Sequence, residues 1–392
     1  MSVDILWDTE YIDSLLYDMQ AGIYYDSPRS SPYYTQLLED WALCISIYEE
    51  GCLLSSASTS ISKVFTFENS GTKDPLITAV CNVPLPADYV DEPADTTSFD
   101  PAVSQSSDRH KSEGGNARDR ERFSRVTVKQ QLQIVNAKVW RPEKPYVYTL
   151  VVSLRNRLSG EVLQAESCHF GVRTVGVHDG LLCVNNLPIL IRGVNLHEFS
   201  PVSGHTVSTD LQEADIKLMK RNNVNAIRTS HYPHSSWLYE LCNIYGLYVV
   251  DEANIETHGM LPSVSRLANQ SLWYETYMHR VKRMIERDKT HVCVIAWSLG
   301  NESGYGEVHD LLADWVRKRD PSRIVLYEPA SYGTRDPHGA NKVLATDVLF
   351  PMYCMVDDCV KFANMYPNMP LILSAYSHMM GNSGGNLLDY WT

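Results

Sequence analysis

The sequence predicts a multidomain protein in which an immunoglobulin-like β-sandwich precedes an incomplete (β/α)8 barrel of the TIM type. Three observations predict this fold class. The chain has 392 residues, more than one ordinary hydrophobic core accommodates. Residues 61–178 alternate apolar and polar side chains with a period of two, as half-buried strands do. From residue 179 onward, buried apolar runs alternate with amphipathic helical patterns, which is typical of a parallel barrel.

The first of these regions contains four segments that we expect to be strands. They are KVFTFEN, VTVKQQLQIV, YVYTLVVSLRN and VLQAESCHFGVRTV, and a further strand is expected at WALCISIY, residues 41–48. Residues 91–124 are poor in apolar side chains and rich in Ser, Asp, Arg and Gly. Such a composition buries too little surface to offset the entropy of ordering, so we expect a mobile loop there. Strands with turn signals over roughly a hundred residues favour an immunoglobulin-type sandwich.

The barrel region opens with a hairpin in LLCVNNLPILI, which we expect to turn at Asn185-Asn186. Seven buried segments follow, whereas a closed barrel of this type needs eight strands. The segments are ILIRGVN, NAIRTS, GLYVVDEAN, VCVIAWSLGN, RIVLYEP, DVLFPMY and LILSAYS. We therefore predict a barrel that stops before its eighth strand.

Two helices between these strands show amphipathic patterns. The first, residues 209–223, is predicted to begin with a Thr209/Gln212 capping box. Its predicted apolar face consists of Leu211, Ala214, Leu218 and Met219. The second, residues 272–289, repeats apolar side chains at Trp273, Tyr277, Val281, Met284 and Ile285.

Charge and composition exclude several classes of function. The net charge of −13 and the absence of a basic stripe argue against nucleic-acid binding. No apolar run approaches the length of a membrane span, and the first residues lack the positive charge of a secretion signal. The nine cysteines are scattered, with no Cys-x-x-Cys pair. We interpret them as reduced thiols, mostly in the core, and expect a cytoplasmic protein.

Polar side chains follow each of the seven predicted strands. They are Asn195, His197, Glu198, Arg228, Ser230, His231, Asp251, Glu252, Asn254, Glu256, His258, Asn301, Glu302, Glu328, Tyr353 and His378. A single polar residue at the end of a strand is more often exposed to solvent, or hydrogen-bonded within the fold, than functional. This remains our interpretation of Glu252 and Glu328. Solvation does not explain why the same side of seven successive strands is polar, so we expect a functional site there.

The chemistry of these side chains indicates a sugar site. Two carboxyl groups can flank a glycosidic bond, while amides, histidines and aromatic rings bind sugar hydroxyls and ring faces. The group Glu256, His258 and Glu302 could also hold a divalent cation. Its oxygen-rich ligands favour magnesium, and its histidine leaves manganese or zinc open.

Three stretches closely resemble the β-galactosidases of glycoside hydrolase family 2, of the large bacterial lactose-cleaving type. They are RGVNLHEFSP, NAIRTSHYPHSSWLYELCNIYGLYVVDEANIETHGM and VIAWSLGNESGYG. The first family signature fits Asn225 to Pro233 completely, and the second fits Asp288 to Glu302 except at Thr290 and Ala296. The resemblance runs from about Ser124 to the last residue, and more loosely over residues 1–30.

The resemblance implies a domain organisation. Residues 1–60 are a remnant of the family's jelly-roll domain and the start of the sandwich. Residues 61–178 are the sandwich, and residues 179–392 are the catalytic barrel, truncated before strand eight.

The resemblance also implies an activity and its residues. The activity is cleavage of terminal β-D-galactose from β-galactosides such as lactose, by a retaining mechanism. Glu302 matches the general acid/base, and Glu256, His258 and Glu302 match ligands of a magnesium ion. The ligands of the family's sodium ion are not all present. The residues that match the lining of the galactose pocket are His197, His231, Asn301, Tyr353 and His378.

The seventh strand departs from the family pattern. The family's nucleophile is a glutamate, and Ala375 occupies that position, between Ser374 and Tyr376. Alanine cannot form a covalent glycosyl intermediate, so we expect this chain to be inactive or strongly impaired. The alternatives are an inactive relative that binds β-galactosides or a partner, and an unstable truncated product. A homo-oligomer remains open.

Overall fold

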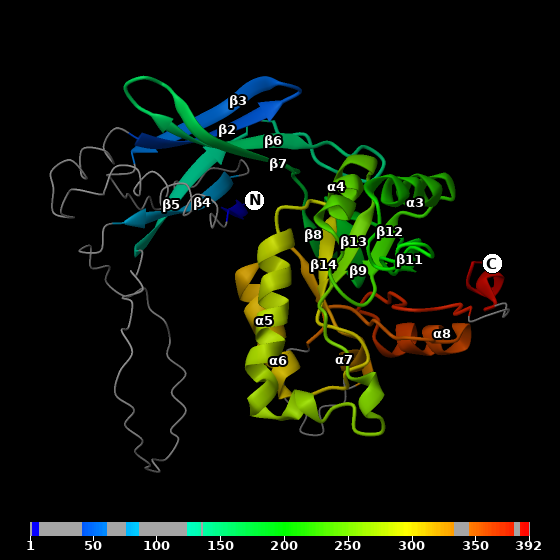
Figure 1. The fold of residues 1–392 in the computed structure, drawn as a ribbon. Helices are drawn as coiled ribbons and strands as arrows, with labels where there is room; N and C mark the ends of the chain where they lie inside the picture. The colour runs from blue at the N-terminus through cyan, green and yellow to red at the C-terminus, as the bar shows by residue number, and fades with distance from the viewer. Residues whose placement is uncertain are drawn as a thin grey trace, which may run out of the picture.

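The computed structural model shows a β-sandwich beside a parallel sheet that helices flank (Figure 1). The structure describes residues 2–7, 41–60, 76–85, 124–134, 136–332, 345–379 and 385–391. The expected strand KVFTFEN and all but the last residue of the expected mobile loop at 91–124 lie outside the described residues. Most of the expected jelly-roll remnant does so too, and that prediction stays open.

The sandwich consists of two sheets, and its strand β6 confirms the alternation seen in the sequence. The four-stranded antiparallel sheet has the order β3-β2-β6-β7, and the three-stranded sheet has the order β1-β4-β5. The strands are β1 (Ser2–Trp7), β2 (Trp41–Glu49), β3 (Cys52–Ser60), β4 (Leu76–Leu85), β5 (Ser124–Gln133), β6 (Tyr148–Asn156) and β7 (Val162–Phe170). In β6 the buried positions include Tyr148, Leu150, Val152 and Leu154, which follow the period of a half-buried strand. The sequence had not indicated β3, whose many serines hide its alternation.

A buried arginine links the sandwich to the barrel. Arg173 donates to the carbonyl oxygens of Val292 at 3.2 Å, Val294 at 2.5 Å and Ser322 at 2.9 Å. Because these carbonyls lie before and within the barrel strands, the sandwich is fixed against the amino-terminal side of the parallel sheet. The opposite, carboxyl-terminal side of the strands is left for the candidate site.

The barrel region contains five parallel strands in sequential order, after a small hairpin sheet. The hairpin sheet consists of β8 (Val175–His178), β9 (Leu181–Val184) and β10 (Leu187–Pro188). It turns at Asn185 and Asn186, both with positive φ, as predicted. The parallel strands are β11 (Gly193–Leu196), β12 (Ala226–Thr229), β13 (Tyr248–Glu252), β14 (Val294–Ser298) and β15 (Ile324–Leu326).

The sixth and seventh predicted segments lie parallel to each other but form isolated bridges instead of strands. The bridges join Leu349 to Leu371 and Met352 to Ala375. The amide of Asp347 donates to Val325 O at 2.8 Å, so the sixth segment follows β15 in the predicted order. Pro351 lies within the sixth segment and Pro370 directly precedes the seventh, and proline cannot donate to a ladder. A pocket of about 680 Å³ lies between the seventh segment and β11, where an eighth strand would close the barrel.

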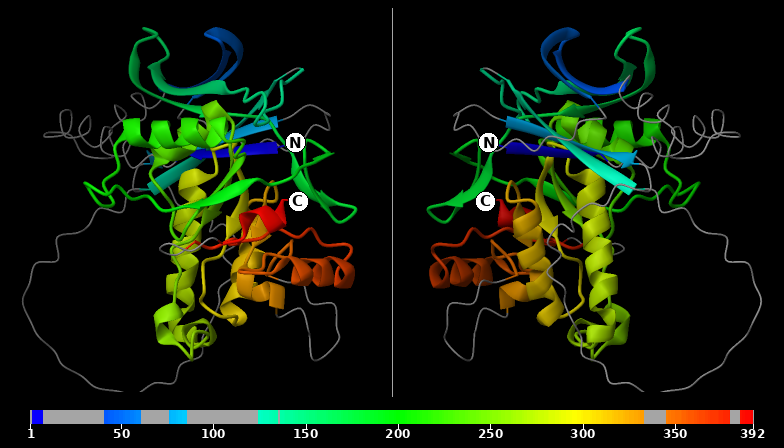
Figure 2. Two further views of the ribbon diagram at one scale, coloured as in Figure 1. Left: turned by 90° about the vertical axis from the view of Figure 1, so that its right-hand side faces the viewer. Right: turned by 90° about the vertical axis from the view of Figure 1, so that its left-hand side faces the viewer.

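Helices cover the outside of this sheet, and α5 and α6 pack beside each other (Figures 1 and 2). They are α3 (Thr209–Arg221), α4 (Ser236–Tyr245), α5 (Ser271–Asp288), α6 (Glu307–Arg319), α7 (Glu328–Tyr332) and α8 (Val356–Met365), with short 3₁₀ helices η1 (His258–Met260), η2 (Leu267–Asn269) and η3 (Leu387–Tyr390). No helix in the described part of the chain is both long and apolar enough to cross a membrane.

The pattern predicted for α5 is largely confirmed, while that for α3 is partly wrong. Tyr277, Val281, Met284 and Ile285 are buried in α5, although Trp273 is exposed. In α3 the N-cap is Ser208, whose hydroxyl accepts from the amide of Leu211 at 3.3 Å. The predicted capping box is wrong because Thr209 is already helical. The predicted apolar face is also wrong in part: the buried positions are Gln212 and Ile216, and Ala214 and Leu218 are exposed.

Candidate functional site

Glu252, at the end of β13, is fully buried and binds three polar partners. The Arg228 guanidinium donates from Nε to Glu252 Oε2 at 2.7 Å and from Nη2 to Oε1 at 3.0 Å. His231 Nδ1 lies 2.6 Å from Oε1, and the Ser298 hydroxyl donates to Oε2 at 2.7 Å. Burial opposes the negative charge, but Arg228, His231 and Ser298 outweigh it and lower the pKa of Glu252. Glu252 is therefore an ionised structural carboxylate, in line with its interpretation from the sequence.

Arg228 extends this network across the sheet. Its Nη2 also donates to Asn301 Oδ1 at 2.9 Å, and its Nη1 donates to Ser374 O at 3.3 Å. Asn301 in turn donates from Nδ2 to Glu256 Oε2 at 2.8 Å. One arginine thus connects β12, the loops after β13 and β14, and the seventh segment, which carries Ala375.

The loop after β14 has a conformation that requires glycine. Gly300 has φ +133°, and a Cβ there would lie 2.8 Å from both the carbonyl oxygen and Cβ of Ile255. The amide of Asn301 donates to Ile255 O at 2.9 Å, and Glu302 has φ +35°. This turn directs the Asn301 side chain inward, toward Arg228, and carries Glu302 to the edge of the site.

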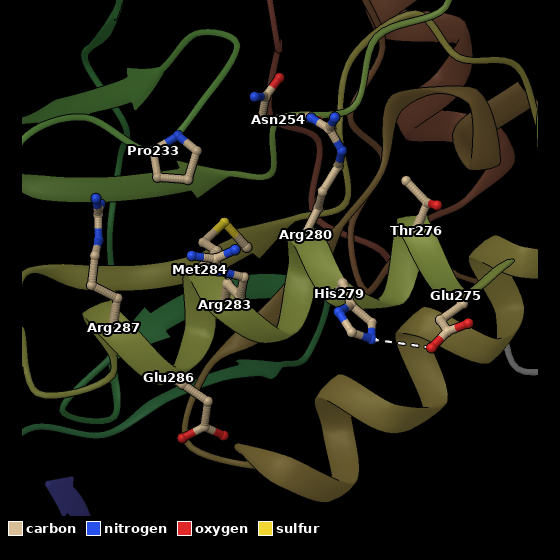
Figure 3. A pocket seen from close by; sticks show the side chains of 10 residues that line it. All are labelled: Pro233, Asn254, Glu275, Thr276, His279, Arg280, Arg283, Met284, Glu286 and Arg287. Carbon is tan, nitrogen blue, oxygen red and sulfur yellow. Dashed lines mark hydrogen bonds and ion pairs between the residues drawn. The ribbon is translucent and has the colours of Figure 1, made fainter. Parts of the chain in front are cut away.

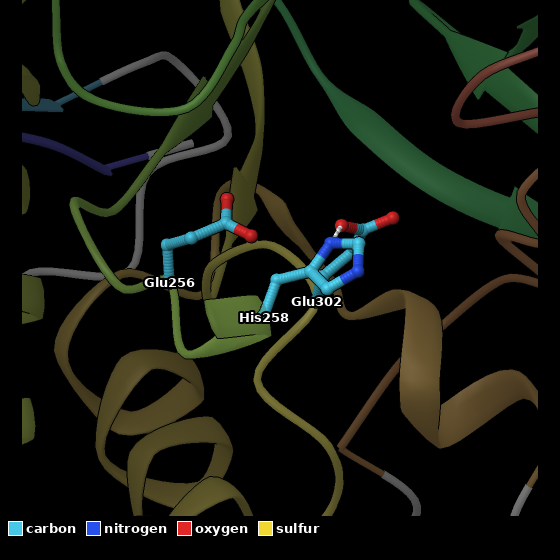
Figure 4. A group of neighbouring side chains, drawn as sticks. All are labelled: Glu256, His258 and Glu302. Atoms are coloured by element: carbon cyan, nitrogen blue, oxygen red, sulfur yellow. Dashed lines mark hydrogen bonds and ion pairs between the residues drawn. The ribbon is translucent and has the colours of Figure 1, made fainter. Parts of the chain in front are cut away.

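Glu256, His258 and Glu302 form an open cluster at that edge (Figure 4). One ligand atom from each lies within 4.8 Å of the others, and His258 Nδ1 contacts Glu302 Oε2. Glu256 and His258 are exposed, while Glu302 is half-buried. Two carboxylates and an imidazole form a donor set that suits a divalent cation. The structure therefore brings together the three residues that the sequence grouped as metal ligands.

A histidine pair borders the network on its other side. The rings of His197 and His231 meet edge to face, with centroids 5.4 Å apart. Burial, and then the neighbouring His231, lower the pKa of His197. Its ring is therefore neutral at neutral pH and offers one donor and one acceptor, as recognition of sugar hydroxyls requires.

Tyr353 and His378 form a second aromatic pair beside the alanine. Their rings meet edge to face at 5.4 Å, and the Tyr353 amide donates to Ala375 O at 2.7 Å. Burial, and then the charge of Glu302, raise the pKa of Tyr353, so its hydroxyl stays protonated and lies within the field of Glu302. Ala375 and Arg228 both line the pocket of about 680 Å³.

All nine candidate residues thus lie at the carboxyl ends of the strands or in the loops that follow. They are His197, His231, Glu256, His258, Asn301, Glu302, Tyr353, Ala375 and His378. Sequence reasoning missed the central role of Arg228 and did not consider Ser298. The available signal was a charged residue directly after a buried apolar strand, with Glu252 at the corresponding place on the next strand.

A separate surface groove of about 930 Å³ runs along the outer face of α5 (Figure 3). Arg280, Arg283 and Arg287 line it, together with Glu275 and Glu286. None of the nine candidate residues is among the side chains that line this groove. Its size alone does not make it the site, because the convergent polar groups lie at the strand ends.

A parallel barrel sheet with clustered carboxylates, histidines and amides at its carboxyl edge, behind an immunoglobulin-like sandwich, is the architecture of the multidomain glycoside hydrolases. The chain belongs to glycosyl hydrolases family 2. Residues 175–392 match the family's TIM barrel domain, and residues 73–173 match its model "Glycosyl hydrolases family 2".

The chain is similar to bacterial proteins named β-galactosidase. It is 48% identical over 276 residues to one from Pseudoalteromonas haloplanktis, which covers 67% of this chain and 26% of that protein. It is 45% identical over 273 residues to one from Pectobacterium atrosepticum, covering 67% of this chain and 25% of that protein. The chain thus spans about a quarter of the length of these curated relatives.

A solved structure supports the fold. An FMN-binding β-glucuronidase from Facaelibacterium prausnitzii L2-6 superposes with a TM-score of 0.59, at 18% identity, over 88% of this chain and 46% of that one. At this identity the similarity shows the fold alone.

Proposed function

We propose that this chain carries the acid/base half of a retaining β-galactosidase site that recognises terminal β-galactosides. The observation that supports it best is that Arg228 bonds on one side to Asn301, which holds Glu256 of the group that contains Glu302, and on the other to the carbonyl of Ser374, the neighbour of Ala375. A glycosidic bond between them would face a carboxyl group on one side only. The similarity to proteins named β-galactosidase supports galactose as the sugar.

Glu302 serves as the general acid/base in this proposal. It is half-buried at the mouth of the site, where a leaving group still reaches solvent. A carboxyl group there protonates the glycosidic oxygen and then deprotonates the incoming nucleophile. Glu252 is unsuited to that role, because it is fully buried and bound to Arg228 and Ser298.

Glu256, His258 and Glu302 hold a magnesium ion in this proposal. The donor atoms lie close enough together to share one ion, and the exposure of Glu256 and His258 leaves room for bound waters. The bound cation supplies positive charge beside Glu302. The chain's own part is to hold the three ligands through the Asn301–Glu256 hydrogen bond and the turn at Gly300.

The remaining candidate residues bind and orient the sugar. Asn301 is almost fully buried and already held by Arg228 and Glu256, so its amide is fixed for a hydroxyl. His197, His231, Tyr353 and His378 supply ring edges and polar atoms on both sides of the network. Preorganised groups of this kind lose little entropy when a ligand binds.

Ala375 leaves the attacking role unfilled. Its methyl group borders the pocket that Arg228 also lines, so a small anion has room beside the anomeric carbon. The proposed outcome is a chain that binds β-galactosides but does not hydrolyse them at a normal rate. The loss of a covalent nucleophile commonly reduces kcat by a factor of about 10⁴ or more.

Azide rescue tests this proposal. The purified chain is incubated with an activated aryl β-galactoside, with and without azide, and release of the phenol is measured. We expect release only with azide, together with formation of a galactosyl azide, and loss of both in Glu302→Gln. Glu307→Gln is the matched control, since Glu307 lies outside the site and accepts a hydrogen bond from the Tyr274 hydroxyl at 3.0 Å. Ordinary hydrolysis without azide would contradict the vacant nucleophile position.

The second candidate function is binding alone. It is favoured by Ala375, which lines the 680 Å³ pocket and offers no carboxylate to attack a bound sugar. A melting temperature that galactose raises, without azide-dependent turnover, would support binding alone. The absence of any cooperative transition would instead support an unstable product.

A further inference from the structure

Two cysteines contact each other at the start of α8, directly after the site residue Tyr353. Cys354 is buried and Cys359 is half-buried. The Cys359 thiol donates to Cys354 O at 3.8 Å, and the Cys354 thiol donates to Met355 O at 3.7 Å. Nothing in the proposed galactoside chemistry uses either thiol.

Helix geometry explains why these side chains meet. Met355 is the N-cap of α8, so Cys354 occupies the position before the cap and Cys359 the fourth helical position. Apolar residues at these two positions commonly pack together and fix the entry of the chain into the helix. The amides of Asp358 and Cys359 both donate to Met355 O at 2.9 Å and close the first turn, and the two cysteines pack beside it.

The surroundings favour a reaction at Cys359 first. Cys359 is the more accessible thiol, on an exposed helix with no fully buried residue. Burial, and then contact with the Cys359 thiol, raise the pKa of Cys354 to about 12. Capping Cys359 removes the second of these causes and so favours the thiolate of Cys354.

We propose that Cys354 and Cys359 are a redox modification site, in which low-molecular-weight disulfides such as oxidised glutathione reversibly oxidise the two thiols to a disulfide at the start of α8. The Cys359 thiolate attacks one glutathione sulfur, forming a mixed disulfide and releasing one glutathione thiol. The Cys354 thiolate then attacks Cys359 Sγ, forms the Cys354–Cys359 bond and expels the second glutathione. Two protein thiols are oxidised, one glutathione disulfide is reduced, and the two protein protons end on the released thiols.

The bond would form next to the candidate site. Tyr353 precedes Cys354, and the Tyr390 hydroxyl donates to Cys354 O at 2.8 Å. A disulfide needs converging side chains, with Cβ atoms about 4 Å apart, and Cys359 Sγ lies 3.8 Å from the carbonyl oxygen of Cys354, so the side chain of Cys359 points toward its partner. The proposal does not rest on the galactoside function.

Peptide mapping of the native chain tests the site. Trypsin releases both cysteines in one peptide, residues 343–361, since Lys342 and Lys361 flank it. After incubation with oxidised glutathione and then iodoacetamide, we expect this peptide without alkyl groups and about 2 Da lighter than its reduced form. Dithiothreitol should restore two alkylatable thiols. Two alkylated thiols after oxidation, or glutathione that stays on Cys359, would overturn the proposal.

Variants and an unfolded control separate native geometry from proximity along the chain. Cys354→Ser should accumulate the mixed disulfide on Cys359, while Cys52→Ser, which removes an exposed thiol elsewhere, should leave the intrapeptide disulfide unchanged. The native chain should hold the disulfide at a glutathione disulfide-to-thiol ratio at least about tenfold lower than the chain in concentrated urea. Equal ratios would overturn the role of the helix start. The wild-type mapping needs no variant, so a variant that fails to fold leaves that result standing.

Discussion

Replacing Arg228 by methionine would remove the cation from a network that joins three parts of the barrel. Arg228 and Glu252 are 5% and 0% exposed, and two hydrogen bonds of 2.7 and 3.0 Å join them. Methionine keeps most of the volume but leaves Glu252 charged, with only His231 and Ser298 beside it. Breaking a buried ion pair on one side commonly costs about 3–5 kcal/mol.

That cost should appear as a large shift in thermal unfolding. For a domain of roughly 200 residues, 1 kcal/mol corresponds to about 2–4 °C in Tm, so we expect a decrease of about 6–20 °C. Circular dichroism during thermal unfolding, with urea unfolding as a second measure, checks the value. A second substitution, Glu252→Leu, should recover part of the loss, since it removes the unpaired buried charge.

The chain offers a matched control pair. Arg319 and Glu286 have the same forked geometry, with bonds of 2.6 and 2.9 Å, but they are 20% and 41% exposed. Because solvent screens such a pair, Arg319→Met should cost less than about 1 kcal/mol. A loss in Arg228→Met no larger than that of the control would refute the reasoning from burial.

The same carboxylate predicts an acid limit. Since the folded state lowers the pKa of Glu252, its contribution is present above the unfolded pKa near 4.5 and is lost as pH falls through the folded pKa. Below about pH 4.5, urea unfolding should show wild-type stability falling more steeply than that of Glu252→Gln. Ala375→Glu should have a kcat/KM about 100-fold or more below that of a full-length family member. The reason is that the neighbouring 680 Å³ pocket would leave a bound sugar loosely placed, and equal values would contradict this. Magnesium should raise the Tm of the wild-type chain by a few degrees at saturation, and Glu256→Gln should remove most of that rise in a thermal-shift titration. Gly300→Ala should lower the free energy of unfolding by about 2 kcal/mol or more, because its φ of +133° and the 2.8 Å approach to Ile255 disfavour a Cβ; an unchanged urea midpoint would count against it.

The order of the barrel strands could be predicted from the sequence, because buried apolar runs and helical periods are local signals. The consecutive residues Asn185 and Asn186 likewise predicted the hairpin turn, because asparagine tolerates positive φ. The start of α3 could not be placed to the residue, since Ser208 and Thr209 are both good caps and only the backbone decides between them. The sixth and seventh segments were read as strands because their apolar content is that of buried strands. Pro351 removes one donor from the middle of their pairing, which is left as two isolated bridges.

The candidate site likewise has one part that could be predicted from local signals and one part that could not. Its residues could be predicted because each follows a strand, and strand ends gather at one edge of a parallel sheet. Which of these residues holds the others in place could not be predicted, because that depends on side-chain contacts between strands. Arg228 and Glu252 lie 24 positions apart and Arg228 and Ser374 lie 146 apart, so the sequence gives no sign that one arginine joins all three.

The contacts of this network indicate which parts of the site depend on the side chain of Ala375. The Arg228 guanidinium donates to the carbonyl oxygen of Ser374, and the Tyr353 amide donates to that of Ala375, so both acceptors in the seventh segment are backbone atoms. Neither bond depends on the side chain at position 375, so a carboxylate can be absent there without disturbing Asn301, Glu256 or Glu302. In the proposed function, the geometry that would position a sugar is therefore separable from the group that would attack it. For that reason, azide-dependent turnover is a sharper test of this site than the presence or absence of ordinary hydrolysis.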